Sequence, residues 1–254
     1  MTGSRPRRRT RPVRVAAPRC RWPACASRGR GPGRCAAATW LAAAAVAVVV
    51  PLGRVPTWLA LHLLLLGAAT TAILVWSEHF TAALLHLPAR PAGRRWAVLA
   101  SANAGALLVL VGVPARWPAL TVAGAALVAA AVGWHGADLA RSTRTALAGR
   151  FGYLVWFFVA AAVAFLGGVS AGVLLATGRA PGDHERWHAL HVHLGLLGWV
   201  ALTVLGTQFT LWPTVLHTRI GARSRAAARW CLLLCAGGLA VAAGGLLTWT
   251  RAVV

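Results

Sequence analysis

The amino-acid sequence predicts an all-α fold: a polytopic transmembrane bundle of about seven helices. Hydrophobic residues make up 58% of the 254 residues and charged residues only 12%, against roughly 25% charged residues in soluble proteins. Seven apolar stretches each approach or exceed the about 20 residues that cross the hydrocarbon of a bilayer. They lie at 36–53, 57–87, 96–113, 117–137, 151–177, 187–216 and 227–249.

Residues 1–35 differ from the rest and predict a disordered, basic, cytoplasmic tail ahead of a transmembrane domain at 36–254. The tail has too few apolar residues to build a core. Its three cysteines, Cys20, Cys25 and Cys35, do not have the spacing of a metal site. The tail and first span also resemble a signal peptide, in which a charged region precedes an apolar one. The internal repeat described below argues against cleavage.

The charged residues predict how the chain crosses the membrane. All 26 basic residues are arginine, and eleven of them precede residue 35. The six loops then carry, in chain order, one, three, one, three, two and four arginines, and Arg251 follows the last span. This alternation indicates a cytoplasmic N-terminus and an external C-terminus by the positive-inside rule. It also assigns the net charge of +22 to lipid contact and topology rather than to nucleic-acid binding.

The absence of lysine has two consequences. A retinal protein is excluded, because its Schiff base needs a lysine. Exclusive use of arginine also suggests a GC-rich genome. A multi-pass protein of a bacterial cell membrane is what the resemblances described below imply.

The second and sixth spans indicate an internal repeat. Residues 62–86 align without a gap on 193–217, so that His62 falls on His193 at an offset of 131 residues. The same offset places span one on span five and span three on span seven, which predicts parallel four-helix repeats. Repeat one is 36–150 and repeat two 151–254. The counterpart of span four would start near residue 248, so the second repeat is expected to be incomplete, in a shortened protein or a fragment of a longer one.

The sixth span predicts the functional site. Pro181-Gly182 breaks the chain and Asp183 is a good N-cap, so we expect a helix from His184 to about Pro213. Its 30 residues would extend about 45 Å, leaving roughly two turns outside the hydrocarbon. One stripe of this helix carries His184, His188, His191, Gly195, Gly198 and Gly206, and His193 points about 200° away from His191.

Imidazole beside a glycine stripe can ligate a metal ion or haem iron. The predicted cofactor-binding residues are His62, His191 and His193, and the predicted metal ligands are His184, His188, His191 and His193. An intramembrane histidine is expensive and is a functional candidate by default, whereas His184 and His188 also fit an incidental place among the headgroups.

Other polar residues are expected to be structural. Glu78, the one acidic residue within a predicted span, is expected to reach water or to pair with Arg94 or Arg95. Histidines toward the cytoplasmic ends of the spans are expected to be ordinary interface residues; they are His79, His86, His135 and His217.

The sixth span resembles a known family. His191-Val-His193 followed by Gly198, Gly206, Thr210 and Pro213 is similar to the H-x-H-x4-G-x7-G-x3-T-x2-P pattern of NnrS-type membrane proteins. These are twelve-helix haem and copper proteins linked to nitric-oxide stress. The match covers one helix, and Leu194-Gly195 replaces the Glu-Met that usually follows the second histidine.

Two further resemblances imply where ligands and partners would be. The haem-copper oxidase subunits, distant relatives of that family, also carry ligand histidines on the second helix of each four-helix arc, the places of His62 and of the pair His191 and His193 here. The run that ends LWPTVLHTRI also resembles the membrane region fused ahead of cupredoxin domains in some multicopper oxidases and nitrite reductases. The resemblance therefore implies a cupredoxin or multicopper-oxidase domain as a partner.

The sequence is compatible with three functions. The first is binding of haem, or of copper, for redox or nitric-oxide-related chemistry. A complete oxygen-reducing site is not expected, because the one tyrosine, Tyr153, is not in the sixth span. The second is a small-molecule transporter, for which the candidate midplane polar groups are Thr70, Thr71, Thr203, Thr207 and Gln208. The third is a non-catalytic membrane anchor or assembly subunit. Whether the protein is an enzyme stays open.

Overall fold

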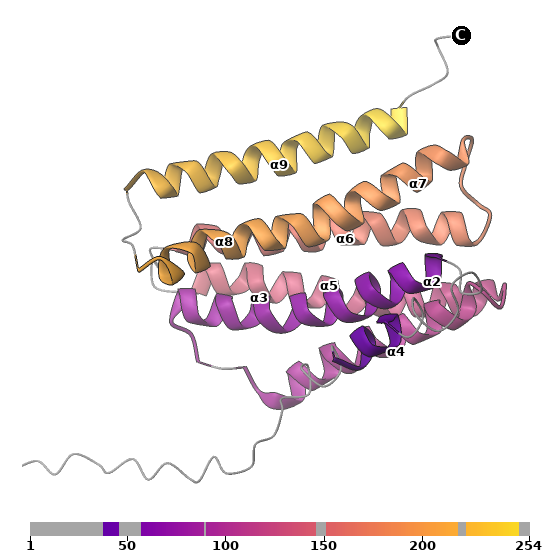
Figure 1. Ribbon diagram of the computed structural model, residues 1–254, viewed down its shortest axis with the longest axis horizontal. Helices are drawn as coiled ribbons and strands as arrows, with labels where there is room; N and C mark the ends of the chain where they lie inside the picture. The colour runs from indigo at the N-terminus through magenta and orange to yellow at the C-terminus, as the bar shows by residue number, and fades with distance from the viewer. Residues whose placement is uncertain (1–37, 46–56, 89, 146–150, 218–221, 249–254) are drawn as a thin grey trace, which may run out of the picture. The chain divides into compact units, whose positions relative to one another are not determined.

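The computed structural model describes residues 38–45, 57–88, 90–145, 151–217 and 222–248, and its regular elements there are all helical (Figure 1). Six of its helices are long and apolar enough to cross a membrane. In chain order the elements are α2 (Thr57–His62), η1 (Leu63–Ala69), α3 (Thr70–Leu85), α4 (Ala92–Gly112), α5 (Pro118–Thr145), η2 (Gly152–Leu154), α6 (Val155–Ala176), α7 (His184–His193), η3 (Leu194–Ala201), α8 (Leu202–Val215) and α9 (Ala222–Thr248).

Six of the seven predicted spans are confirmed. Two of them are composite: α2, η1 and α3 form one helix over Thr57–Leu85, and α7, η3 and α8 form another that spans His184–Pro213. The predicted first span, 36–53, lies outside the described residues except for 38–45, which are helical. The predicted tail, 1–35, lies wholly outside them.

The helix boundaries follow local chemistry. The sixth span begins at His184 as predicted, because the Asp183 side chain accepts a hydrogen bond from the Glu185 backbone N–H at 3.0 Å. The fourth span is longer than predicted. It continues from 137 to Thr145, because an ion pair between Asp138 and Arg141 on one face extends the helix beyond the apolar stretch.

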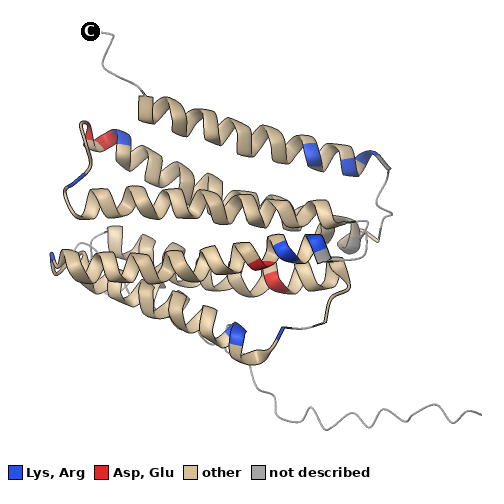
Figure 2. Ribbon diagram, turned by 180° about the vertical axis from the view of Figure 1, so that it is seen from behind, with Lys and Arg blue, Asp and Glu red and all other residues tan. Residues whose placement is uncertain are grey.

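Successive helices alternate in direction, which defines two ends of the bundle. We call the end where α2 and α7 begin and α6 finishes the histidine end. The arginine end is where α3 and α5 finish and α4 and α9 begin. Figure 2 shows that the charged residues it colours lie toward these ends, with helix that carries no charged residue between them.

Glycines allow the closest helix contacts. On α4 and α5, a Cβ at Gly105 would lie 2.7 Å from the Gly124 carbonyl oxygen and 2.8 Å from the Val128 nitrogen. The predicted glycine stripe of the sixth span packs against α6. A Cβ at Gly198 would overlap Ala164, and one at Gly206 would lie 2.7 Å from Phe157. This part of the stripe therefore accommodates a neighbouring helix rather than a flat ligand.

Large apolar side chains cover the outside of the bundle. Val163 on α6 is 66% exposed and Leu234 on α9 is 69% exposed. Soluble proteins rarely expose such continuous apolar surface, and a lipid bilayer would cover it. The fold is that of a polytopic helical membrane protein.

We predict that the histidine end is extracytoplasmic, because the arginines favour the other side. Alkaline phosphatase fused after Gly182 should be active, and after Arg223 it should be inactive. Green fluorescent protein fused at the same two points is the control and should show the reverse pattern. The opposite pattern for both reporters would invert the topology.

A second prediction concerns the contact between α4 and α5. The change Gly105→Ala should lower the free energy of unfolding by about 1 to 3 kcal/mol, because the new Cβ meets backbone atoms that cannot move aside. Gly237→Ala on α9 is the matched control, since nothing lies within 4 Å of its added Cβ. The control should be neutral or stabilising by up to about 1 kcal/mol. Thermal unfolding in detergent compares the two, and equal melting temperatures would contradict the packing.

Candidate functional site

Two π-helical segments occupy corresponding positions in the two composite helices. η1 begins at Leu63, directly after His62, and η3 begins at Leu194, directly after His193. The two starting residues are 131 positions apart (194 − 63), the same offset as in the sequence alignment. π-helices are rare and frequently occur at functional sites. The repeat itself stays a prediction, and this recurrence is a structural observation in its favour.

The two π-helical segments are joined by a buried hydrogen bond. The Trp199 indole N–H in η3 donates to the Thr70 hydroxyl at 3.1 Å. Thr70 follows η1 and donates in turn to the Leu65 carbonyl at 3.0 Å. Both side chains are almost fully buried. This chain of hydrogen bonds connects the second and sixth spans below the histidines.

His62 and His191 face each other at the histidine end. Their ring centroids are 6.0 Å apart and their planes differ by 7°. The Nδ1–H of His62 donates to the Trp58 carbonyl at 2.8 Å, and that of His191 donates to the Gly168 carbonyl at 2.8 Å. In the neutral ring with the proton on Nδ1, Nε2 has a lone pair that can bind a metal.

The surroundings hold both rings in place. Trp58 stacks on His62 with 4.2 Å between ring centroids. A Cβ at Gly172 of α6 would lie 2.9 Å from His191 Cε1, so only glycine leaves room for this ring. α7 packs against α6 and α9. The imidazole of His191 is therefore set by α6 in a position where it meets His62.

The other predicted histidine ligands lie elsewhere. His193 is exposed, and its Nδ1–H donates to the Ala189 carbonyl of its own helix at 2.7 Å. His184 and His188 are also exposed. Within the described part of the chain, no three His, Cys, Asp or Glu side chains come together closely enough to hold a metal ion. Of the predicted set, the structure brings together His62 and His191 alone.

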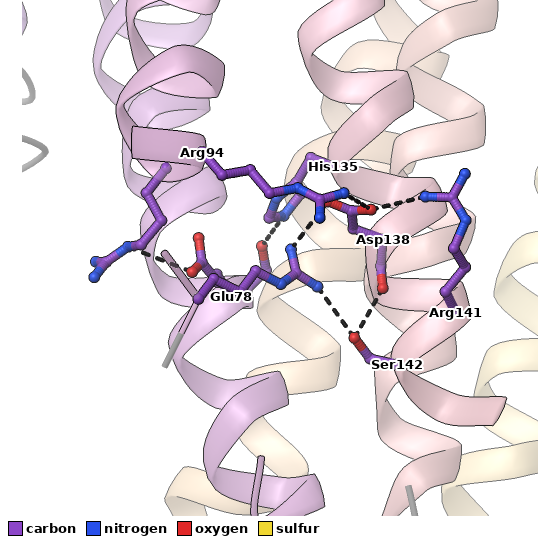
Figure 3. A network of polar contacts seen from close by, with 9 residues as sticks. Glu78, Arg94, His135, Asp138, Arg141 and Ser142 are labelled. Carbon is purple, nitrogen blue, oxygen red and sulfur yellow. Dashed lines mark hydrogen bonds and ion pairs between the residues drawn. The ribbon is translucent and has the colours of Figure 1, made fainter. Parts of the chain in front are cut away.

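A polar network lies at the arginine end (Figure 3), centred on a carboxylate that the sequence analysis did not identify. Asp138 of α5 is 5% exposed, and its carboxylate pairs with Arg94 at 2.5 Å, Arg141 at 2.8 Å and Arg90 at 3.5 Å. Arg90 also donates to Ser142 at 3.1 Å. Asp138 was missed because it immediately follows the predicted end of its span, although Arg141 three residues later was an available signal.

The sequence predicted a place for two further residues of this region, Glu78 and His135. Glu78 pairs with Arg95 at 3.3 Å, which confirms one of the two expected partners. The prediction for His135 was wrong. It is 3% exposed rather than at the interface, and its Nε2 lies 2.8 Å from the Ser77 hydroxyl. Glu78, Arg95 and His135 line a cavity of about 10 Å³, which is about the space that one water molecule requires.

The threonine hydroxyl groups considered for transport form hydrogen bonds within the protein. The Thr71 hydroxyl donates to Asn103 Oδ1 at 3.2 Å, and Trp40 donates to the same oxygen. Thr203 donates to the Trp199 carbonyl at 2.7 Å. Thr207 likewise bonds a carbonyl of its own helix, and Gln208 is exposed. These hydrogen bonds hold the helices and their neighbours together.

Comparisons of the chain with protein-family models, curated proteins and solved structures found no match. The resemblance to NnrS-type proteins therefore stays a prediction that rests on one helix.

We predict that the buried Asp138 carboxylate stabilises the arginine end of the bundle. Asp138→Asn should destabilise the protein by about 2 to 3 kcal/mol, because three guanidinium groups lose their common counter-charge in a partly buried place. Glu78→Gln, which affects a single arginine, is the matched comparison and should cost less. Thermal unfolding in detergent measures both, and an equal or smaller effect at Asp138 would contradict this assignment.

Proposed function

We propose that this membrane protein binds a redox-active metal, haem iron in the first place or copper, through His62 and His191. The observation that carries the proposal is the pair of facing imidazoles, each with Nδ1 bonded to a backbone carbonyl. That arrangement is typical of metal-ligating histidine, in which the second ring nitrogen is fixed by a hydrogen bond. Imidazole binds both iron and copper well.

The separation of the rings is compatible with one shared metal. A metal about 2.0 to 2.1 Å from each nitrogen would place two imidazole centroids roughly 6 Å apart, and the observed centroid distance is 6.0 Å. The rings are stacked at 7° and the Nε2 lone pairs lie in the ring planes, so one ring would turn on binding a shared ion.

Both ligands occupy the second helix of their repeat, which supports a site on the axis relating the two repeats. They are not at identical positions, because the alignment pairs His62 with His193. In the structure His193 is exposed and His191 faces His62. The two histidines of the H-x-H pattern therefore have different roles in the proposal, and His193 is left for a second, outward-facing contact.

The biological setting belongs to the same proposal. A metal near the extracytoplasmic face of a bacterial membrane would supply one-electron or nitric-oxide chemistry. A cupredoxin or multicopper-oxidase domain on that side would be a suitable electron partner. The protein itself binds and orients the metal and excludes water from it through Trp58 and α6.

The test is the absorbance and metal content of the protein purified in detergent after expression with haem precursor and copper both supplied. We expect bound iron with a Soret band, or bound copper without one. His62→Ala and His191→Ala should each lower metal content at least tenfold, because one of two ligands is lost. His193→Ala should retain the metal, since its ring faces away from the pair.

His79→Ala is the matched control, because His79 is an exposed histidine on α3 nearer the arginine end. Wild-type protein with neither metal, or undiminished metal in both ligand variants, would refute the proposal. Loss of metal in His193→Ala with retention in His191→Ala would assign the ligand to the other histidine of the pattern.

A further inference from the structure

The network at the arginine end carries more positive than negative charge. Among the described residues it contains four arginines, Arg90, Arg94, Arg95 and Arg141, and two carboxylates, Glu78 and Asp138. The balance is 4 − 2 = +2. Figure 3 shows the labelled arginines Arg94 and Arg141 approaching the Asp138 carboxylate from different sides. The group as a whole therefore carries two more positive than negative charges, although each of its arginines contacts a carboxylate.

The network lies about one hydrocarbon thickness along its helices from the opposite end of the bundle. Asp138 is 20 residues beyond Pro118, the first residue of α5, and Glu78 is 21 residues beyond Thr57, the first residue of α2. At 1.5 Å per residue both lie about 30 Å along their helices. That length equals the thickness of the hydrocarbon, so helices that start at one boundary bring these residues to the other.

The arginines range from half-buried to exposed. The Arg90 side chain is 20% exposed, whereas Arg94 is 42% and Arg141 is 67% exposed. The positively charged group therefore extends from the half-buried Arg90 to the exposed Arg141 at the surface. An anion that approaches from the membrane side can reach it.

Two tryptophans flank the same surface. The Arg94 guanidinium lies 5.5 Å from the centroid of the Trp134 ring. Trp96, the next residue after Arg95, is 54% exposed, and Trp134 is 58% exposed. Exposed tryptophan is typical of the level where acyl chains meet headgroups. Arginine beside tryptophan at this depth combines a phosphate-binding group with a surface for lipid chains.

We propose that Arg94 and Arg141, together with Arg90 and Arg95, bind the phosphodiester of an anionic phospholipid in the adjoining leaflet. The lipid supplies the negative charge that the two carboxylates do not. Basic pockets between helices on the cytoplasmic side recognise anionic headgroups by the same chemistry. This site is independent of the histidine pair, and either proposal can fail alone.

The experiment is native mass spectrometry of the full chain in detergent, titrated with phosphatidylglycerol or phosphatidylcholine. The wild type should bind phosphatidylglycerol in preference. The test variant, Arg94→Gln combined with Arg141→Gln, leaves Arg90 on Asp138 and Arg95 on Glu78, so its net charge is zero. At about fivefold per arginine, its affinity for phosphatidylglycerol should fall about 25-fold.

The matched control is Arg223→Gln combined with Arg225→Gln, which removes the same charge from exposed positions on α9 at the same end. It should bind phosphatidylglycerol like the wild type. If the test variant does not fold, Arg141→Gln alone, at the most exposed of the four arginines, should give about a fivefold loss. Equal binding by wild type and test variant, or equal loss in test and control, would overturn the proposal.

A third titration with glycerol phosphate separates the two sources of the anion. The lipid should bind far more tightly, because its chains contribute apolar contact beside the tryptophans. Equal affinity for glycerol phosphate and phosphatidylglycerol would overturn the assignment to a lipid in favour of a soluble phosphate.

Discussion

Every polar backbone group that lies in hydrocarbon needs a partner within the protein, and the rest of this structure depends on that constraint. It explains why the described elements are helical. It also explains why the irregular stretches are π-helical segments rather than breaks. In η1 the ladder shifts by one residue, and the Thr70 hydroxyl bonds the Leu65 carbonyl five residues earlier. The hydroxyl thereby satisfies a carbonyl next to the point where the register changes.

The two facing histidines also form hydrogen bonds with backbone carbonyls of the helices. His62 bonds the carbonyl four residues before it, and His191 bonds a carbonyl of α6. Each imidazole is therefore satisfied at one nitrogen and open at the other. The arginine end differs, because there the buried carboxylate of Asp138 pairs with arginine side chains. Apolar packing with a few threonine, asparagine and tryptophan bonds separates the two regions.

Much of the fold could be predicted from composition, and part of the site could not. Six spans, the Asp183 cap and the pairing of Glu78 follow from apolar length, a strong capping residue and one nearby arginine. The burial of His135 and Asp138 could not be predicted from composition. Apolar stretches end at the first charges, but α5 continues for two turns because Asp138 pairs with Arg141 on the same helix and with Arg94 on α4. The π-helices also leave no mark in composition, since they change register and not residue type.

The π-helical segments also make the two ends of a span independent of one another. An α-helix turns about 100° per residue, so one added residue would rotate everything beyond it away from its partners. A π-helical turn takes up the added residue locally, and the residues after it keep their face. Thr70 and the buried stretch of α3 can thus stay packed against the bundle while His62, on the other side of η1, points in a direction of its own. η1 and η3 therefore keep the helix axis continuous, while the side chains before and after each of them point in directions that are set separately.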